Sequence, residues 1–210
     1  MLQRDGETTL TERQRKMVDE AEKSCRRLVA LIAEMSDISK LDAGLISLAR
    51  QPLDLFTLVG EVADLVQEAK DREVRLEVRG DAAGAPVAGD AVRLRSAFDA
   101  IFRAILREKR GPTTVIAERR LDSRDGLTSA VVVVAEAANV QVAYERTPGP
   151  FDEKRGGLGL ALPLARRVIE GHGGRIWSPA CAEREAPGDE DDAALARGSA
   201  IVSVPLGGPR

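Results

Sequence analysis

The spacing of apolar residues separates a long amphipathic helix near the start of the chain from a region of alternating short helices and strands. Thr11 to Gln14 has the sequence of a capping box, in which a threonine and a glutamine three residues later begin a helix. After it, apolar side chains recur at intervals of three and four as far as Leu41, and no glycine or proline interrupts them before Gly44. The pattern predicts one helix from residue 11 to about residue 41, after a flexible N-terminus of residues 1–10.

The apolar face of this predicted helix has no second long helix beside it in the sequence to cover it. Burying a large apolar side chain contributes roughly 1.5–3 kcal/mol, so an uncovered stripe is costly. We therefore expect the helix to pack on a second copy, on a partner protein or on the rest of the chain, and we favour a two-chain helical bundle. The predicted contact face comprises Met17, Ala21, Leu28, Leu31, Met35 and Ile38.

The rest of the chain has the pattern of an α/β unit. Residues 74–78 alternate strictly between apolar and polar, which is typical of a half-buried strand. Further strands are predicted at 113–117, 129–135, 175–178 and 199–205, and helices at 55–70, from Asp90 onward and from Leu160 to Gly171. The segments between them are interpreted as a linker at 51–54, a flexible segment at 80–89, a loop at 137–155 and an acidic hairpin extension at 183–192.

A glycine-rich segment precedes the last of these helices. Gly156, Gly157 and Gly159 allow the backbone to turn sharply or to approach a bulky group closely. The helix that follows would point its unpaired N–H groups and the positive end of its dipole at an incoming anion. The same spacing also fits a tight loop joined to a core helix, and by itself it favours that plainer interpretation.

Composition excludes several classes of function. The net charge is −3 and aromatic residues make up only 3% of the chain, which argues against binding nucleic acid. The longest wholly apolar run, Ala130 to Ala135, is too short to span a membrane, and no apolar segment typical of a signal peptide follows Met1. Cys25 and Cys181 lack the spacing of metal ligands. We therefore expect a cytoplasmic protein with no membrane span and no metal site.

Four motifs, in their order along the chain, resemble those of bacterial sensor histidine kinases. Residues 39–44 resemble the end of the family's second dimerisation helix, and Gly89-Asp90 with Arg93 to Arg95 resembles the start of its N-box helix. Residues 156–162 resemble its second glycine box, and residues 170–176 its helix-to-strand turn.

This resemblance runs from about residue 10 to Pro205. It implies a two-layer α/β sandwich of the GHKL ATP-binding type, with a mixed sheet covered on one face by helices and preceded by a long dimerisation helix. The chain would then consist of the dimerisation-type helix in residues 11–50 and an ATPase-like domain in residues 51–210.

The groups that carry the chemistry of that family are missing from the matching positions. Transfer of phosphate from ATP to histidine needs an acceptor histidine, a divalent ion and a pocket for adenine. The single histidine, His172, is expected at a helix C-terminus in a structural role, and residues 1–10 cannot supply the helix that would carry the acceptor. Ala100 and Ala104 stand where the family has asparagines, the second of which holds magnesium through an oxygen. No residue is therefore assigned as catalytic, as a phosphoacceptor or as a metal ligand.

Residues that resemble nucleotide contacts are retained in part. Glu136 stands where the family has an adenine-binding aspartate, although the glycines that follow it there are absent. The candidate nucleotide contacts are Glu136, Lys154, Arg155, Gly156, Gly157 and Gly159. Each also has a structural interpretation, as a strand-end carboxylate, a solvated charged loop or a tight turn. We expect no cofactor, with ATP and magnesium as the alternative.

Two classes of function follow. The first is a degenerate histidine-kinase-like protein that acts by binding a second copy, another histidine kinase or a response regulator in a two-component pathway. The second is a diverged ATP-dependent kinase that phosphorylates a histidine on a partner chain. If the chain is a fragment of a longer kinase, a preceding segment would restore the histidine but not the asparagines. A histidine phosphotransferase is less favoured, because no histidine lies on the long helix.

Overall fold

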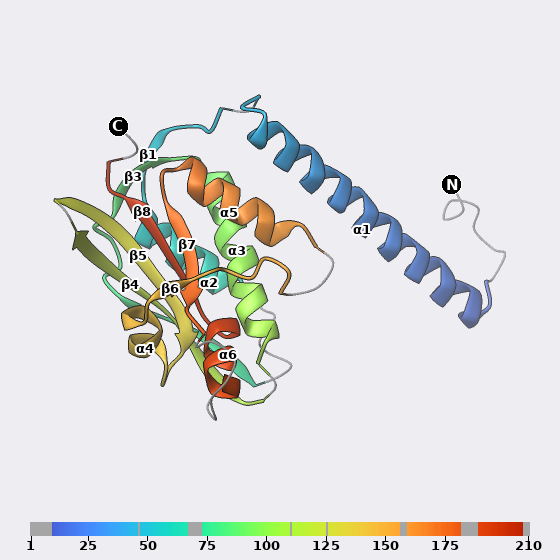
Figure 1. Ribbon diagram of the computed structural model, residues 1–210. Coiled ribbons are helices and arrows are strands. Elements are labelled where there is room, and N and C mark those ends of the chain that lie inside the picture. The colour runs from blue at the N-terminus through green and yellow to red at the C-terminus, as the bar shows by residue number, and fades with distance from the viewer. Residues whose placement is uncertain are drawn as a thin grey trace.

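The computed structural model describes residues 10–45, 47–66, 73–109, 111–124, 126–155, 159–181 and 189–207. A long helix projects from an α/β domain built on a mixed sheet (Figure 1). The helices are α1 (Glu12–Asp42), α2 (Leu55–Leu65), α3 (Ala91–Arg107), α4 (Val140–Glu145), α5 (Ala161–Gly171) and α6 (Asp189–Arg197). The strands are β1 (Gln51–Asp54), β2 (Val74–Gly80), β3 (Pro86–Gly89), β4 (Thr113–Arg124), β5 (Leu127–Glu136), β6 (Pro148–Gly149), β7 (Arg175–Pro179) and β8 (Ala200–Pro205).

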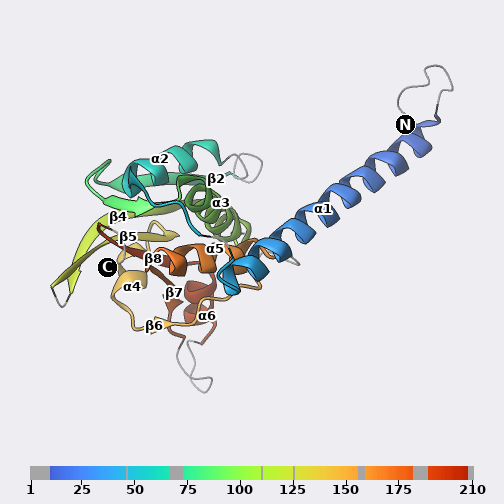
Figure 2. The same cartoon turned by 90° about the horizontal axis from the view of Figure 1, so that it is seen from above.

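Helix α1 begins and ends as the sequence predicts. The Thr11 hydroxyl accepts the Gln14 N–H, and the Gln14 side chain accepts the Thr11 N–H, which completes the capping box. At the other end Gly44 adopts a φ of +66°, and the Leu45 N–H donates to the Lys40 carbonyl. No residue of α1 is buried, and its N-terminal half extends away from the domain (Figure 2). The predicted helix is confirmed, whereas residues 1–9 of the predicted flexible N-terminus lie outside the described residues.

The sheet has the strand order β2-β4-β5-β8-β7-β6. Strand β2 is parallel to β4. The other four neighbouring pairs, β4-β5, β5-β8, β8-β7 and β7-β6, are antiparallel, so the predicted mixed sheet is confirmed. Helices α2, α3 and α5 bury their apolar faces against one side of it, where Phe56, Phe98 and Ile101 are fully buried. This packing confirms the α/β fold class and supplies the main core.

A second, smaller core lies on the other side of the sheet. Ile116, Val131, Val133 and Ile201 alternate along their strands with residues of the main core and so point to this face. Val140 of α4 and Leu195 of α6 belong to the same cluster. Two short helices therefore cover part of the face on which the sequence predicted none.

Several connecting segments are more ordered than the sequence suggested. The predicted linker at 51–54 is β1, which pairs with β3 inside the segment predicted to be flexible. The predicted loop at 137–155 contains α4 and β6. In the acidic segment, residues 189–192 begin α6 and do not form a hairpin, and residues 182–188 lie outside the described residues.

One carboxylate holds β1, α2 and the turn before β3 together. Asp54 Oδ1 accepts the N–H groups of Phe56 and Thr57 and so caps α2, while Oδ2 accepts those of Gly84 and Ala85. Burial raises the pKa of this carboxyl group, but the four N–H donors outweigh that effect and hold its pKa below the ordinary value. Periodicity cannot reveal β1 and β3, because these contacts between side chain and backbone fix them.

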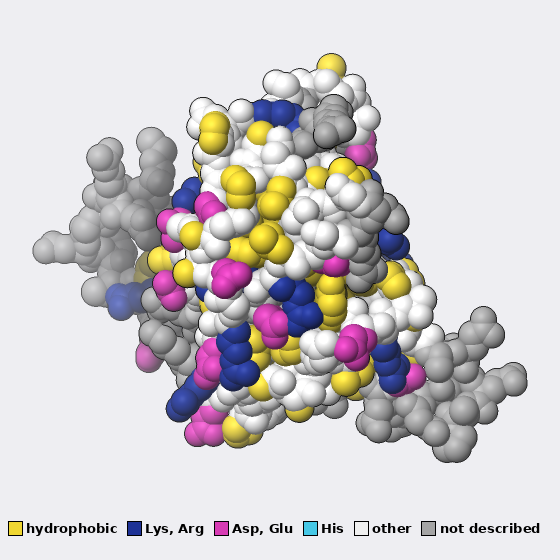
Figure 3. All heavy atoms as spheres, turned by 90° about the vertical axis from the view of Figure 1, so that its left-hand side faces the viewer, with side chains coloured by type: hydrophobic (Ala, Val, Ile, Leu, Met, Phe, Trp, Pro, Cys, Tyr) yellow, Lys and Arg dark blue, Asp and Glu magenta, His cyan; other side chains and the backbone are white. Residues whose placement is uncertain are grey.

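The surface away from α1 mixes charges of both signs. On the side of the molecule shown in Figure 3, Lys and Arg side chains lie among Asp and Glu side chains, with small apolar groups between them. Within the described residues, no helix combines the length and the apolar character that crossing a membrane requires.

Candidate functional site

A cavity of about 1000 Å³ lies between α3 and α5 and is bordered on one side by α1. Its floor is largely apolar, since Ala97 and Ala104 come from α3, and Leu162, Ala165 and Val168 from α5. This is the place where the segments resembling the N box and the glycine box come together. Gly159, which precedes α5, also lines it.

Ala100 and Ala104 both face this cavity. They are four residues apart and so occupy the same side of α3, one turn from each other. Their methyl groups offer no lone pair to a cation, whereas magnesium requires oxygen ligands. Among the described residues, no group of three or more His, Cys, Asp or Glu side chains is arranged to hold a metal ion.

Guanidinium groups around the cavity are paired with carboxylates. Arg103 Nε lies 2.7 Å from Asp99 Oδ2, one turn away on α3. Arg93 lies 3.6 Å from Asp37 of α1 and 3.7 Å from Asp90, the residue that caps α3. The positive charges of Arg93 and Arg103 are therefore balanced locally.

Arg155, a predicted nucleotide contact, lines the cavity but is only 7% exposed. Its Nε donates to the carbonyl of Asp152, and its two terminal nitrogens donate to the carbonyls of Ala196, Arg197 and Ser199 and to the Ser178 hydroxyl. These bonds use all five N–H donors of a guanidinium group. Burial lowers the pKa of Arg155, although Asp152 and Glu108 raise it. The side chain joins the segment before α5 to the end of α6 and directs no remaining donor at a ligand.

The other predicted nucleotide contacts do not converge on this cavity. Lys154 is exposed and is not among its lining residues, and only its backbone N–H bonds to Asp152. Glu136 also lies outside the lining, where it accepts a hydrogen bond from Thr113 at 2.8 Å and pairs with Lys109 at 3.7 Å. Gly156 and Gly157 lie outside the described residues. Of the six candidates, the structure brings Arg155 and Gly159 together.

His172 is 1% exposed at the C-terminal end of α5. Its Nε2 accepts the backbone N–H of Asp90 at 2.9 Å, so its proton lies on Nδ1, which donates to the Val168 carbonyl at 2.6 Å. Burial lowers the pKa of the ring, and Arg50 lowers it further, while the Val168 bond and Asp90 raise it. The predicted structural role is confirmed, but the ring is neutral and is not the dipole-stabilised cation that its position suggested.

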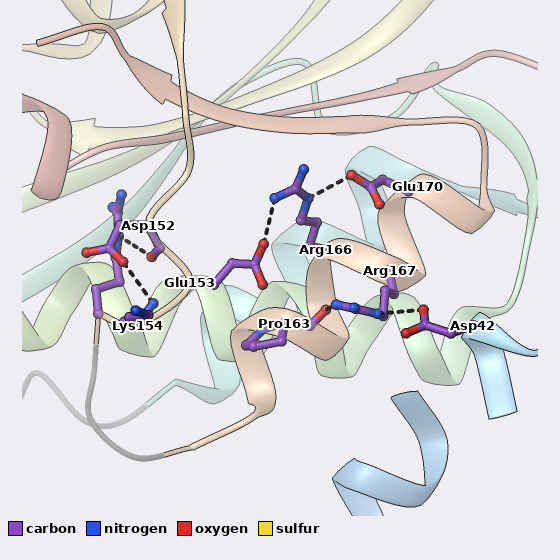
Figure 4. Close-up of polar contacts among 9 residues, drawn as sticks. Asp42, Asp152, Glu153, Lys154, Pro163, Arg166, Arg167 and Glu170 are labelled. Atoms are coloured by element: carbon purple, nitrogen blue, oxygen red, sulfur yellow. Dashed lines mark hydrogen bonds and ion pairs between the residues drawn. The ribbon is translucent and has the colours of Figure 1, made fainter. Parts of the chain in front are cut away.

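Packing of α1 on the rest of the chain was one of the three arrangements expected from the sequence, but the acidic residues that make these contacts were not predicted. Glu34 Oε2 accepts the N–H of Leu160, which precedes α5, at 3.1 Å, and both Glu34 and Asp37 line the cavity. Figure 4 shows Arg167 of α5 pointing to Asp42 at the end of α1, 2.7 Å away. Glu34 and Asp37 are three residues apart and so are neighbours on the helix surface, which is the one signal of this contact in the sequence.

A second arginine of α5 stays within the domain. Arg166 lies between Glu153 and Glu170, at 2.6 Å and 2.7 Å, as Figure 4 shows. The hydrogen bonds to Glu170 and Glu153 raise the pKa of Arg166. Glu153 is one of the acidic residues that offset the basic ones before the glycine box, and this pair fastens that segment to α5.

Known proteins similar to this chain are named as histidine kinases or sensor proteins. No family model matches it. The signal transduction histidine-protein kinase BarA of Escherichia coli K12 is 26% identical over 181 residues, which cover 80% of this chain and 20% of BarA. The sensor protein ChvG of Agrobacterium fabrum is 30% identical over 164 residues, which cover 72% of this chain and 28% of ChvG. The homologues of this chain are sensor histidine kinases.

Solved structures of histidine kinases have the same fold. Full-length ShkA in complex with AMPPNP matches 96% of this chain and 41% of its own, with a TM-score of 0.65 and 19% identity. The histidine kinase ThkA in complex with the response regulator TrrA matches 98% of this chain and 55% of its own, with a TM-score of 0.58 and 16% identity. The histidine-kinase fold predicted from four motifs is confirmed, and the chain spans only about a fifth of the length of BarA.

Proposed function

We propose that this chain is a histidine-kinase-like module of a two-component pathway that acts by binding other proteins and not by magnesium-dependent phosphotransfer. The observation that carries the proposal is the pair of methyl groups, Ala100 and Ala104, at the cavity wall where the family has asparagines. A cavity without an oxygen at either position lacks the side chain through which the family holds its metal ion.

His172 supports the same proposal from the acceptor side. It is the only histidine in the chain, and both of its ring nitrogens are bonded to backbone groups in a buried position. Phosphorylating either nitrogen would break one of these bonds and place a dianion in the core, which carries a large desolvation cost. The chain therefore has no accessible histidine of its own to phosphorylate.

The partners that we propose are a second copy, another histidine kinase or a response regulator. Helix α1 supports this choice, because it buries no residue within its own chain and exposes large apolar side chains such as Met17 and Leu28. The complex of ThkA with TrrA provides the precedent for a response regulator. We propose a cytoplasmic location, because Cys25 and Cys181 are both exposed and unpaired, as is usual in a reducing compartment.

The alternative is a diverged kinase that still uses ATP. The cavity of about 1000 Å³ beside Gly159 supports it, as does the AMPPNP complex of ShkA. Such an enzyme would phosphorylate a histidine on another chain. It would have to bind the triphosphate without the two asparagines and with Arg155 already engaged in five internal bonds.

Calorimetric titration with ATP, in the presence and absence of magnesium, separates the two functions. For a binding module we expect either no detectable heat or a millimolar constant that magnesium does not change. The matched control is Gly159→Val, because an added Cβ at Gly159 meets nothing closer than 4.0 Å and the variant should fold normally. A micromolar constant that depends on magnesium and is lost in Gly159→Val would establish the enzyme in place of our proposal.

A further inference from the structure

Helix α6 is attached to the rest of the domain by few contacts. It lies between β7 and β8, which pair directly with each other, so the sheet does not depend on it (Figure 1). Of its side chains in residues 192–197, Leu195 is buried and the others are half-buried or exposed. Asp192 pairs with Arg146 at 2.6 Å, but both side chains are partly open to solvent. A short helix is marginal in water by itself and an exposed ion pair contributes little, so the bonds at the C-terminal end of α6 matter most for holding it.

Two cationic side chains lie at that C-terminal end. Arg155 Nη1 donates to the carbonyl of Arg197 at 2.7 Å, and Nη2 donates to that of Ala196 at 3.2 Å. Lys109 lies there as well, because a Cβ added at Gly198 would come within 2.7 Å of its Nζ. The end of α6 therefore presents uncharged carbonyl oxygens to one guanidinium group and has one ammonium group beside it.

Arg155 is also held in place independently of α6. Its Nε donates to the Asp152 carbonyl at 3.0 Å, Nη1 to the Ser199 carbonyl at 3.0 Å, and Nη2 to the Ser178 hydroxyl at 2.8 Å. None of these three acceptors belongs to α6. If α6 moved away, one donor on each terminal nitrogen would be released while three bonds still fixed the guanidinium group. Two such donors match two oxygens of an oxyanion.

The charges around these two cations favour a carboxylate over a phosphate. Burial lowers the pKa of Arg155, whereas Asp152 and Glu108 raise it, so both carboxylates lie near the guanidinium group. Lys109 pairs with Glu136 at 3.7 Å. These acidic groups would repel a phosphate dianion more strongly than a carboxylate, which has a single negative charge.

We propose that Arg155 and Lys109 form a binding site for the C-terminal carboxylate of a peptide, and that α6 occupies this site until such a peptide displaces it. A peptide that ended at the position of Arg197 would place its second carboxylate oxygen where the nitrogen of Gly198 now lies, near Lys109. A carboxylate accepts stronger hydrogen bonds from a guanidinium group than carbonyls do. The peptide should also have a leucine-like residue two positions before its end, to replace Leu195 in the smaller core.

Peptide binding to the full chain tests the proposal. In the open variant, a Gly-Ser linker of equal length replaces residues 189–197, so that α6 does not form. The probe is a fluorescein-labelled peptide with the sequence of residues 189–197 and a free C-terminal carboxylate, and the matched control is the same peptide with a C-terminal amide. Fluorescence anisotropy should show that the open variant binds the free acid roughly tenfold or more tightly than the amide. The wild-type chain should bind the free acid roughly tenfold or more weakly than the open variant does, because α6 occupies the site.

Substitutions of the two cations connect this binding to the site. In the open variant, Arg155→Met and Lys109→Met should each weaken binding of the free acid by roughly tenfold and have little effect on the amide. If circular dichroism shows that the open variant is unfolded, Asp192→Asn with Leu195→Ala replaces it, because this pair weakens the attachment of α6 and keeps the rest of the chain.

Three results would overturn the proposal. They are equal binding of the free acid and the amide, no binding of either to a folded variant, and equal affinity of the wild-type and open chains for the free acid. The site goes beyond the proposed function and involves neither α1 nor ATP, so its failure would leave that function standing.

Discussion

At the scale of single residues, His172 shows how a conspicuous side chain can be structural. Its two ring nitrogens connect the end of α5 to the backbone N–H that begins the turn into α3. Gly89 lies against the same ring, since an added Cβ there would come within 3.0 Å of His172 Cδ2 and 2.9 Å of Leu94. The imidazole is therefore a neutral packing element between two helices, at a position where the sequence alone also permits a cation.

This arrangement predicts a loss of stability at mildly acidic pH. Because burial lowers the pKa of His172, the unfolded chain takes up the proton before the folded chain does as the pH falls. The stabilisation is complete above the ordinary histidine pKa and decreases as the pH drops below it toward the folded-state value. Thermal unfolding between pH 7.5 and 5.5 should show a falling midpoint, by about 2–4 °C for each kcal/mol lost in a chain of this size.

His172→Gln provides the control for this pH dependence. The chain has one histidine, and histidine is the side chain whose ordinary pKa lies within this range. The variant should be less stable at pH 7.5 and should have a nearly flat profile. An equally steep profile in His172→Gln would show that another group is responsible.

The role of a side chain could be predicted from the sequence only where its hydrogen-bond partners are close to it in the sequence. The capping box at Thr11 needed four residues and was correct. The role of Arg155 depends on acceptors at residues 178 and 196–199, which no pattern around position 155 reveals. Arg155 precedes the glycine-rich segment and therefore resembled a phosphate contact. In the structure, however, all five of its N–H donors bond to groups of this chain.

At the scale of elements, periodicity identified the large helices and the central strands but missed the short pieces. The sequence of helix α6 contains a pattern typical of a helix, but its high content of acidic residues led us to interpret the segment as a hairpin extension. Four acidic residues at 189–192 precede a run of alanine and leucine, and Arg197 lies in the last turn. This charge order suits the helix dipole at both ends. The acidic cluster was interpreted as solvated, whereas its position at a helix N-terminus was the informative feature.

Arg155 connects the end of α6 to the start of β8, so we expect its removal to destabilise α6. Arg155→Met removes a guanidinium group that satisfies the carbonyls of Ala196, Arg197 and Ser199. Leaving buried acceptors unpaired should lower the free energy of unfolding by about 3 kcal/mol. Urea unfolding followed by Trp177 fluorescence reports on this region, because Trp177 packs against the cluster that contains Leu195.

Lys154→Met is the matched control for this variant. Lys154 is exposed and neighbours Arg155 in the sequence, so its removal should change the free energy of unfolding by less than about 0.5 kcal/mol. Equal destabilisation by the two substitutions would mean that general charge, and not the five hydrogen bonds, holds α6.

At the scale of the whole molecule, the function that we propose combines a retained histidine-kinase fold with altered contact groups at the cavity. The overall fold agrees with that of histidine-kinase structures. Ala100 and Ala104 lie in the cavity wall, Arg155 is engaged internally, and Glu136 is held by Thr113 and Lys109 away from the lining. The departures from the family that we propose thus lie at separate places around the cavity and not at one substituted position.

This distribution predicts that restoring the two asparagines will not restore a kinase. Ala100→Asn with Ala104→Asn returns two amide oxygens to α3, but in the variant Glu136 still lies outside the cavity lining and Arg155 is still engaged in internal hydrogen bonds. Titration with magnesium and ATP should therefore improve by less than about tenfold, or 1.4 kcal/mol. Ala104 is only 3% exposed, so the buried amide should also cost roughly 1–3 kcal/mol of stability.

The single variants separate the two effects. Ala100 is only half-buried, so Ala100→Asn should fold with nearly unchanged stability and serves as the control for Ala104→Asn. If the double variant binds ATP at micromolar concentration in a magnesium-dependent manner, the rest of the site is intact and the loss of function rests on two methyl groups. If binding remains weak while the fold is preserved, the histidine-kinase scaffold persists in this chain without the coordinated set of groups that its chemistry requires.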